Sequence, residues 1–575
     1  MGNPQRQGYL YGTLVLAAGT VVVKLIGAGF KIPLTNLLGG VGMSCFNVAY
    51  DLYYPLYALF VSGVPVAVAK LVSEQVARGQ VQQASRLLHR ALALFTGLGA
   101  LGMGLMFLGA EWFSALVKNP PAALAVRMLA PALFFGCLLA VLRGYWQGMH
   151  NMAPTAVSQV VEAAAKLCLG LGLAVAVTRW GLAGYARTGR VFGQLCGSPA
   201  EARLALLPYS AAGAILGVTA STCCGALYLA WWHRRHRPRR PAVPSFRGEG
   251  RLTRRLLAVA VPVCIASVIS NLTSFIDLIS VMNRLATAVE RAPGLLLAQY
   301  RGLIPAGVGL EQLPSYLYGC YSGLTVPLYN LVPALTGTVG VSLLPAVSAA
   351  WAVGDREQLE RNISSALRIS ALLAMPAGIG LCLLAEPILG LLYASRPQEA
   401  AVILPALRLM GLSSVLLALS LPVNAVLQAT GRASAPVKLF CLGGAVKLGC
   451  NFVLVADPRL NIQAAPVGTL ACCAVVLFGG LWQVLSHTRL QLSIAGVFGK
   501  PLLGGLGCGG AAWLAFRLLH QRWTGGWTTL TAIAIGGIFY LFLVACLKIL
   551  TKADISMLPG GEKFRKLLEK RLRLG

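Results

Sequence analysis

Charged residues are scarce in this chain, and acidic residues are the scarcest of all. Only 11% of the 575 residues are charged, with 18 Asp and Glu against 48 Lys and Arg. Soluble domains carry about 25% charged residues, so the composition excludes a water-soluble globule with a polar surface. Hydrophobic residues instead make up 57% of the chain, and the mean hydropathy is +0.72. We therefore expect the solvent of this protein to be lipid.

The sequence also lacks the alternating polarity that is typical of membrane β-strands. Residues 87–108, 204–232 and 530–550 show no such alternation and are largely apolar, and backbone amides in lipid are satisfied within a helix. Blocks of about 20 apolar residues predict an all-α polytopic membrane protein with about fourteen transmembrane helices. The predicted spans are 10–37, 46–70, 87–109, 121–146, 154–178, 206–232, 256–282, 323–349, 364–392, 405–428, 435–455, 464–486, 498–518 and 527–550.

No CxxC pair occurs among the 15 cysteines, and most of them lie in apolar stretches. This distribution argues against a disulfide framework and favours small buried packing residues. His233 and His236 have a spacing that metal ligands use, but the arginines around them would repel a cation. We predict no metal and no cofactor.

The positive charge is concentrated in polar loops. With fourteen spans, 30 of the 48 Lys and Arg fall on one side, 14 fall on the other, and four lie within helices. The positive-inside rule then places both termini in the cytoplasm, and we read no cleaved signal peptide in Met1–Gly8. Nine arginines beside one Glu in 233–255 indicate a topological anchor rather than a nucleic-acid site. This loop and the basic tail, 551–575, are expected to contact anionic lipid headgroups.

Two stretches of the chain repeat each other. Residues 72–92 match 347–367 at eight of 21 positions with a constant offset of 275, and Gln147, Pro154 and Lys166-Leu167 recur at offsets of 281 or 282. The order of helices is thus preserved, which predicts two parallel lobes related by an axis along the membrane normal. The predicted parts are an N-terminal six-helix lobe (1–232), a basic cytoplasmic linker (233–255), a C-terminal six-helix lobe (256–486), two additional helices (487–550) and the tail (551–575).

Three segments carry a resemblance to a known family. They are Lys24–Gly42 (KLIGAGFKIPLTNLLGGVG), Ser62–Glu74 (SGVPVAVAKLVSE) and Gly340–Ser348 (GVSLLPAVS). The chain resembles the stage V sporulation protein B and polysaccharide biosynthesis group of the multidrug/oligosaccharidyl-lipid/polysaccharide exporter superfamily, which is related to MurJ-type lipid II flippases. MurJ-type flippases carry an Asp and an Arg where this chain has Ser44 and the region around Leu324. The resemblance therefore leaves lipid II as one candidate substrate among several.

The resemblance implies a transporter rather than an enzyme. It implies that a sugar linked to a polyprenyl pyrophosphate moves by alternating access from the inner to the outer leaflet of the plasma membrane of a bacterium. The product would serve cell-wall, spore-cortex or polysaccharide synthesis, with cell-wall synthases as expected partners.

A pyrophosphate crossing the membrane requires cations in a wet cavity, and four intramembrane lysines qualify. Lys24 and Lys31 are seven residues apart, which places them on one helix face. Lys166 and Lys447 are the duplicated pair. Glu162 lies four residues before Lys166 and offers it an ion pair, whereas no acidic residue lies one turn from Lys447. Lys447 is therefore the better pyrophosphate candidate of this pair.

Further intramembrane residues are candidates for substrate recognition and for gating. Asn271 and Asn330 are candidates to read sugar hydroxyls, although such amides as often join helices. Asp277 is expected to pair with a lysine, and Pro65 and Pro345 are expected to interrupt helices that gate the cavity. Lys70 and Arg143 lie near predicted cytoplasmic ends, where snorkelling accounts for them.

Three other functions fit the same composition. A cation-coupled multidrug exporter shares the fold but calls for acidic residues in the cavity, and the first helix has two lysines and no acid. A membrane glycosyltransferase needs acidic residues as a base or as metal ligands, and no two of the five Asp lie near each other in sequence. A non-transporting membrane assembly factor stays open.

Overall fold

The protein is a bundle of long helices. The structure, a computed structural model, describes residues 9–236, 249–490, 493, 495–523 and 525–550. Within these residues, twelve helices are long and apolar enough to cross a membrane, which confirms the predicted all-α polytopic fold. The number of spans, fourteen, stays a prediction. The tail at 551–575 and most of the basic linker lie outside the described residues.

The described chain divides into two compact units. The first comprises residues 1–289 and 304–323, and the second comprises 290–303 and 324–575. The division differs from the predicted lobes, because the helix after the linker packs into the first unit, with Gly63 N–H against Cys264 Sγ at 3.3 Å. The two predicted lobes therefore remain a prediction from the repeats.

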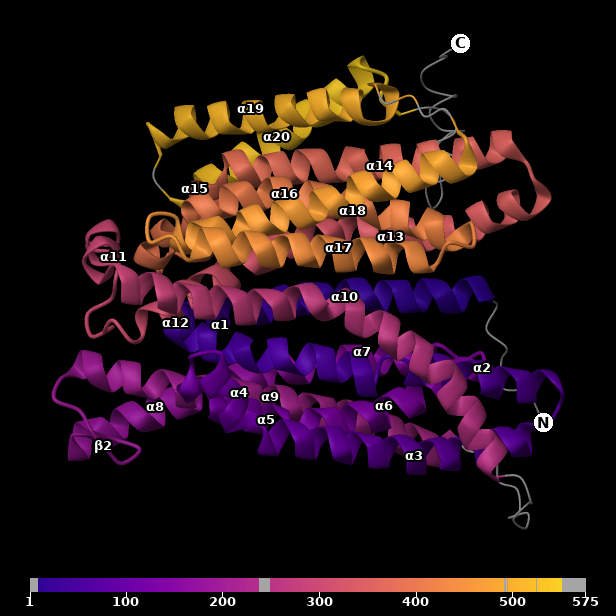
Figure 1. The fold of residues 1–575 in the computed structure, drawn as a ribbon, viewed down its shortest axis with the longest axis horizontal. Helices are drawn as coiled ribbons and strands as arrows, with labels where there is room; N and C mark the ends of the chain where they lie inside the picture. Colours follow the sequence, from indigo (N-terminus) through magenta and orange to yellow (C-terminus); the bar gives the residue numbers. More distant parts are fainter. Residues whose placement is uncertain (1–8, 237–248, 491–492, 494, 524, 551–575) are drawn as a thin grey trace. The chain divides into compact units, whose positions relative to one another are not determined.

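The first unit contains nearly all of the N-terminal helices (Figure 1). Its elements are α1 (Tyr9–Phe60), α2 (Val64–Ala77), α3 (Val81–Leu108), α4 (Ala110–Leu116), η1 (Pro120–Ala122), α5 (Ala123–Leu129), α6 (Pro131–Gly148), α7 (Ala153–Ala165), η2 (Lys166–Gly170), α8 (Leu171–Thr188), β1 (Arg190–Val191), β2 (Gln194–Leu195), α9 (Pro199–His236), most of α10 (Glu249–Arg291), α12 (Leu313–Cys320) and the start of η3 (Tyr321–Thr325).

The second unit is built in the same way from long apolar helices. Its elements are α11 (Pro293–Gln299), α13 (Val326–Val353), α14 (Arg356–Leu383), α15 (Ala385–Leu392), α16 (Pro397–Ala429), α17 (Ser434–Cys450), η4 (Asn451–Val455), η5 (Asn461–Ala464), α18 (Ala465–Thr488), η6 (Ala495–Gly499), α19 (Lys500–His520) and α20 (Gly526–Cys546).

The long first helix bends at Gly39. There the backbone has φ 60° and ψ −171°, outside the helical region. A non-glycine residue is costly at such a φ, so the glycine permits the bend. The predicted spans 10–37 and 46–70 thus become the two arms of α1, and the second arm continues through a turn at 61–63 into α2.

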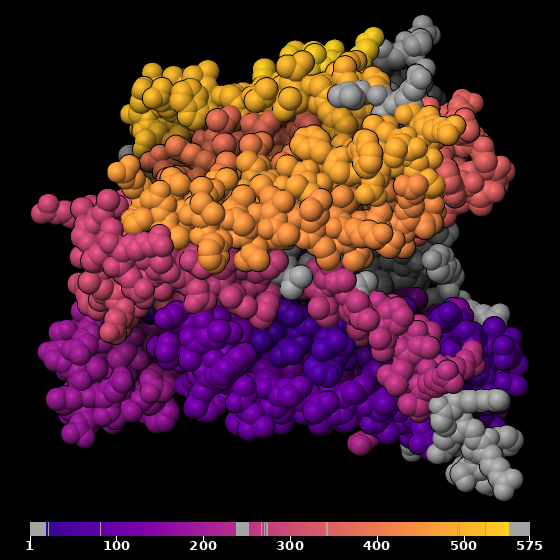
Figure 2. All heavy atoms as spheres, viewed as in Figure 1, coloured from indigo at the N-terminus to yellow at the C-terminus, as the bar shows by residue number. Residues whose placement is uncertain are grey.

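Small residues let the helices approach closely within each unit. A Cβ on Gly217 of α9 would lie 2.5 Å from the Gly170 backbone, and one on Gly378 of α14 would lie 2.7 Å from the Gly411 carbonyl of α16. Close backbone approach is the usual basis of helix packing in lipid, where hydrophobic burial drives little association. Figure 2 shows the outer surface of these helices, coloured along the chain.

The two repeated stretches fold alike. Residues 72–92 run from α2 through a turn into α3, and residues 347–367 run from α13 through a turn into α14. The matched glycines of these turns, Gly79 and Gly354, both have left-handed φ angles, of 72° and 75°. The conserved spacing between the stretches therefore corresponds to a shared local structure.

Candidate functional site

A polar cluster lies in the first unit where α1 meets α12. Lys31 Nζ donates to Asn47 Oδ1 at 2.6 Å, and Asn47 Nδ2 donates to Ser322 Oγ at 2.9 Å. The bend at Gly39 makes the first contact possible, because it folds the two arms of α1 so that residues 16 positions apart meet. Tyr318 OH, one turn before Ser322, donates to Asp51 Oδ2 at 2.8 Å. The crossing of α1 and α12 is thus polar inside an apolar bundle.

The crossing is also tight. A Cβ on Gly319 would lie 1.6 Å from the Gly40 carbonyl oxygen, and one on Gly40 would lie 2.7 Å from Cys320 Sγ. Only residues without a side chain fit there, so the polar cluster is held by direct backbone contact.

Aromatic rings surround two of the predicted lysines. Lys31 Nζ lies 4.8 Å from the centre of the Phe46 ring, and Lys166 Nζ lies 5.0 Å from Phe30 and 5.1 Å from Tyr50. The rings adjoin one another, with centres 6.2 Å apart for Phe30 and Phe46 and 4.9 Å apart for Phe46 and Tyr50. Ring faces attract cations without neutralising them. The structure therefore brings Lys31 and Lys166 to one aromatic group.

Neither lysine forms an ion pair within the part of the chain that the structure describes. Both side chains are half-buried in helices of membrane-spanning length. An amide and ring faces hold them in place of carboxylates. Their positive charge is therefore available to an anion that reaches the cluster.

Glu162 has a different partner from the one that the sequence indicates. Its carboxylate accepts from Arg143 Nη2 at 2.8 Å and from Thr222 Oγ1 at 3.2 Å, and Arg143 Nε donates to Ser158 Oγ at 2.9 Å. The side chains of Arg143 and Glu162 are 14% and 28% exposed. The expected ion pair with Lys166 is thus replaced by one that joins α6, α7 and α9, and the snorkelling interpretation of Arg143 is wrong.

The remaining predicted cations lie elsewhere. Lys24 is exposed on the first arm of α1. Lys447 belongs to the second unit, where its side chain is 4% exposed and packs against α18 at Gly468, whose Cβ would lie 3.4 Å from Lys447 Cγ. Lys447 is buried in this structure, which weakens it as a contact for pyrophosphate relative to Lys31.

Of the other predicted residues, Asp277 interacts electrostatically with Tyr318 of the cluster, whereas no contact among the described residues brings the predicted amides to it. Asn271 Nδ2 donates at 2.8 Å to the Ser267 carbonyl of its own helix, α10. Asn330 is exposed on α13 in the second unit, and Asp277 is half-buried on α10. Their proposed substrate contacts stay predictions.

The two predicted gating prolines occupy different positions. Pro65 lies in the first turn of α2, where its missing N–H leaves no helical hydrogen bond unmade, so it begins a helix rather than interrupting one. A Cβ on Gly144 of α6 would lie 2.7 Å from the Pro65 carbonyl, which fixes this turn against its neighbour. Pro345 lies within α13, and its side chain is outside the described residues.

Sequence reasoning missed Asn47, Ser322 and the aromatic rings. One signal was available, because Ser322 follows Asn47 by 275 residues, which is the offset of the first repeat. Residues related by duplication can meet where the repeats face each other. The aromatic residues carried no such mark, since rings are common in any apolar helix.

Comparison with known proteins identifies relatives over the whole chain. A sequence profile of the polysaccharide biosynthesis protein family matches residues 9–352, and one of lipid II flippase MurJ matches residues 325–533. An uncharacterized membrane protein, YabM, of Bacillus subtilis (strain 168) is 26% identical over 575 residues, which cover 98% of this chain and 97% of the relative. Stage V sporulation protein B of the same organism is 25% identical over 475 residues, which cover 82% of each chain.

Solved structures share the fold. A lipid II flippase MurJ in an inward closed conformation matches with a TM-score of 0.62 and 13% identity, over 93% of this chain and 98% of that one. An inward-facing MATE family multidrug transporter matches with a TM-score of 0.59 and 15% identity, over 81% of this chain and 94% of that one. The predicted resemblance to this group is therefore confirmed: the chain belongs to the polysaccharide biosynthesis protein family.

Proposed function

We propose that this membrane protein moves a polyprenyl-pyrophosphate-linked sugar from the inner to the outer leaflet of a bacterial plasma membrane by alternating access. The observation that carries the proposal is the pair Lys31 and Lys166, two half-buried cations held by an amide and by ring faces. A pyrophosphate has strong acceptor oxygens, and ammonium groups bind such oxygens with charge-assisted hydrogen bonds.

The surrounding side chains suit the sugar that the pyrophosphate carries. Asn47 and Ser322 supply an amide and a hydroxyl next to Lys31, and Tyr50 and Phe46 supply ring faces. Ligand sites combine apolar walls with a few fixed polar groups in this way. Two acidic residues nearby already have partners, because Glu162 pairs with Arg143 and Asp51 accepts from Tyr318. A cation-coupled drug exporter is disfavoured for that reason.

An apolar groove in the second unit suits the lipid chain. It has a volume of about 240 Å³, and its walls are almost wholly aliphatic. Leu328 and Leu335 of α13, Pro376 of α14, and Cys508 and Ile533 of α19 and α20 contribute to it. A polyprenyl tail can lie there at little cost, because these walls are as apolar as the bilayer that the tail leaves.

Two further expectations accompany the proposal. Both termini are placed in the cytoplasm by the positive-inside rule, and the basic loop and tail contact anionic headgroups. Cell-wall synthases that use the exported lipid are the expected protein partners. Labelling of engineered single sites from each side of intact cells tests the orientation.

The experiment that tests the function is transport of a fluorescent polyprenyl-pyrophosphate sugar in proteoliposomes, read as the fraction that a membrane-impermeant quencher reaches. We expect the wild type to move this lipid, and to move a polyprenyl monophosphate sugar more slowly because one phosphate is missing. The double variant Lys31→Met/Lys166→Met is expected to be inactive, and Lys70→Met, an exposed lysine of α2, serves as the matched control. Export of a cationic drug without movement of either lipid would replace the proposal with the exporter function.

A further inference from the structure

A two-stranded hairpin joins α8 to α9 and holds a phenylalanine in an unfavourable backbone conformation. β1 pairs with β2 in the register Arg190 to Leu195 and Val191 to Gln194, so the turn consists of Phe192 and Gly193. Both turn residues have positive φ angles, of 44° and 95°. This geometry favours Asn-Gly or Gly-Gly, and a left-handed conformation costs a bulky residue about 1–2 kcal/mol. Strain of this kind marks a position whose side chain has a use.

The ring of Phe192 is held between two other rings. Its centre lies 4.6 Å from the Tyr209 ring of α9 and 5.7 Å from the Trp180 ring of α8, the latter in an edge-to-face arrangement. Trp180 is itself 72% exposed, so it contributes little to a core. Two aromatic rings are thus presented toward solvent at a fixed mutual angle.

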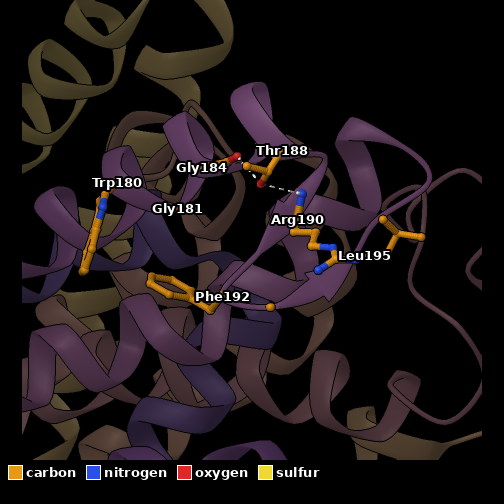
Figure 3. Close-up of a pocket in the computed structure, with 8 residues that line it drawn as sticks. Trp180, Gly181, Gly184, Thr188, Arg190, Phe192 and Leu195 are labelled. Atoms are coloured by element: carbon orange, nitrogen blue, oxygen red, sulfur yellow. Dashed lines mark hydrogen bonds between the residues drawn. The ribbon is translucent and has the colours of Figure 1, made fainter.

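These rings border a pocket of about 560 Å³ between α8 and the hairpin. Trp180, Gly184 and Thr188 line it from one face of α8, and Arg190, Phe192 and Leu195 line it from the hairpin (Figure 3). Thr188 Oγ1 accepts from the Arg190 backbone N–H at 3.3 Å, which ties the hairpin to the helix. The volume lies within the range of small-molecule sites, about 300–1,000 Å³.

The pocket has one cationic side chain in its lining, that of Arg190. Residues 179–203 contain four arginines, at 179, 187, 190 and 203, and one acidic residue, Glu201. Glu201 accepts from the Gly197 backbone N–H at 2.8 Å. Arg190 forms no ion pair with any residue that the structure describes. Its guanidinium is thus available for a carboxylate or a phosphate, which it can bind with two parallel hydrogen bonds.

The length of the helices places the hairpin at the membrane surface. The helical segment Ala153–Thr188 has 36 residues, which at 1.5 Å per residue is about 54 Å, against a hydrocarbon core of about 30 Å. Trp231 and Trp232 lie at the opposite end of α9 from the hairpin, followed by Arg234 and Arg235, as expected of a membrane interface on the cytoplasmic side. Part of the excess of about 24 Å therefore extends past the hydrocarbon core at the hairpin end, so the pocket lies at the level of the headgroups and beyond.

We propose that this pocket, between α8 and the β1–β2 hairpin, is an extracytoplasmic binding site for an acidic sugar unit. Trp180 and Phe192 pack against the C–H faces of the sugar ring, and Arg190 binds its carboxylate. The proposal rests on the proposed function in two respects: the side of the membrane on which the pocket lies, and the source of the sugar, which is a glycan built from the exported lipid. An anionic lipid headgroup offers similar charge, but a glycerol headgroup has no ring face for Trp180 and Phe192 to pack against.

The test measures binding of a disaccharide that contains glucuronic acid to the full-length protein in nanodiscs of phosphatidylcholine, by isothermal titration. We expect saturable binding that weakens at least tenfold in Trp180→Ala and in Arg190→Gln, and that Arg190→Lys partly restores. Trp231→Ala, a similarly exposed tryptophan at the other end of α9, is the matched control and should bind as the wild type does. A neutral disaccharide should bind much more weakly to all of them.

Absence of binding by the wild type, or binding that neither Trp180→Ala nor Arg190→Gln weakens, would overturn the proposal. Retention of phosphatidylglycerol by the wild type that Arg190→Gln abolishes, without disaccharide binding, would identify a lipid site instead and overturn it as well. The same variants are measured for lipid transport, where we expect the wild-type rate. Loss of transport in every protein together with intact disaccharide binding would refute the proposed function and leave this site standing.

Discussion

Replacing Lys31 with methionine separates a binding role of this cation from a structural one. Methionine keeps the length and most of the volume of the side chain, but it removes the charge, the 2.6 Å hydrogen bond to Asn47 and the contact with the Phe46 ring. In the free protein these losses are largely offset, because a half-buried ammonium no longer has to be desolvated. We therefore expect the free energy of unfolding to change by no more than about 1 kcal/mol.

Transport should respond much more strongly. A charge-assisted hydrogen bond to a phosphate oxygen is worth about 1.5–3 kcal/mol, and about 1.4 kcal/mol corresponds to a factor of ten. Lys31→Met should therefore lower the transport rate of a polyprenyl-pyrophosphate sugar about 10- to 150-fold at equal amounts of folded protein. The assay is quenching of the fluorescent lipid in proteoliposomes, with the melting temperature in detergent measured on the same preparations.

Arg143→Met is the matched control, because it also removes one cation from the same unit. It leaves the Glu162 carboxylate without its 2.8 Å ion pair in a mostly buried position, and breaking a buried pair in this way costs about 3–5 kcal/mol. We expect a clear fall in melting temperature for Arg143→Met and almost none for Lys31→Met. Equal destabilisation by the two changes, or wild-type transport by Lys31→Met, would refute the assignment of Lys31 to the substrate.

Three further predictions concern the fold around the site. Gly319→Ala should lower the melting temperature and the transport rate, since its Cβ would lie 1.6 Å from a carbonyl oxygen of α1. The control Gly104→Ala has open space around its Cβ and should be neutral or slightly stabilising. Equal melting curves for the two variants would contradict the tight crossing of α1 and α12. Tyr318→Phe removes the 2.8 Å hydrogen bond to Asp51 and should lower the free energy of unfolding by about 1.5–3 kcal/mol. Thermal unfolding measures this loss, and an unchanged stability would mean that water replaces the hydroxyl. A thiol introduced by Leu195→Cys, 74% exposed on β2, should react with a membrane-impermeant reagent added outside intact cells, above the wild-type background, and reaction only after lysis would reverse the predicted topology.

The predicted helices followed from features that are local in the chain. Apolar runs of about 20 residues predict helices in lipid whatever packs beside them, and the two repeated stretches fold into similar turns that each contain a left-handed glycine. The start of a helix was harder to place, as Pro65 shows, because a proline inside an apolar run looks the same whether it begins a helix or bends one.

The candidate site was predictable in its cations and not in their partners. Lys31 and Lys166 stand out in sequence because an intramembrane charge is rare and costly. Local spacing assigned Glu162 to Lys166, four residues away, yet the structure pairs it with Arg143, 19 residues away. An i,i+4 neighbour is within reach in any helix, but a residue on an adjacent helix becomes the ion-pair partner when packing places its guanidinium closer to the carboxylate.

The amino-acid sequence by itself determined the solvent, the helical class, the membership of the family and the identity of the intramembrane cations, because hydropathy and charge act residue by residue. Only the tertiary structure decided which groups meet. Lys31 reaches Asn47 because Gly39 bends α1, Asn47 reaches Ser322 because Gly40 and Gly319 allow two backbones to touch, and Phe192 borders a pocket because a hairpin turns it toward Trp180. These contacts join residues up to 275 positions apart, and such distances are set by packing, which no local pattern encodes.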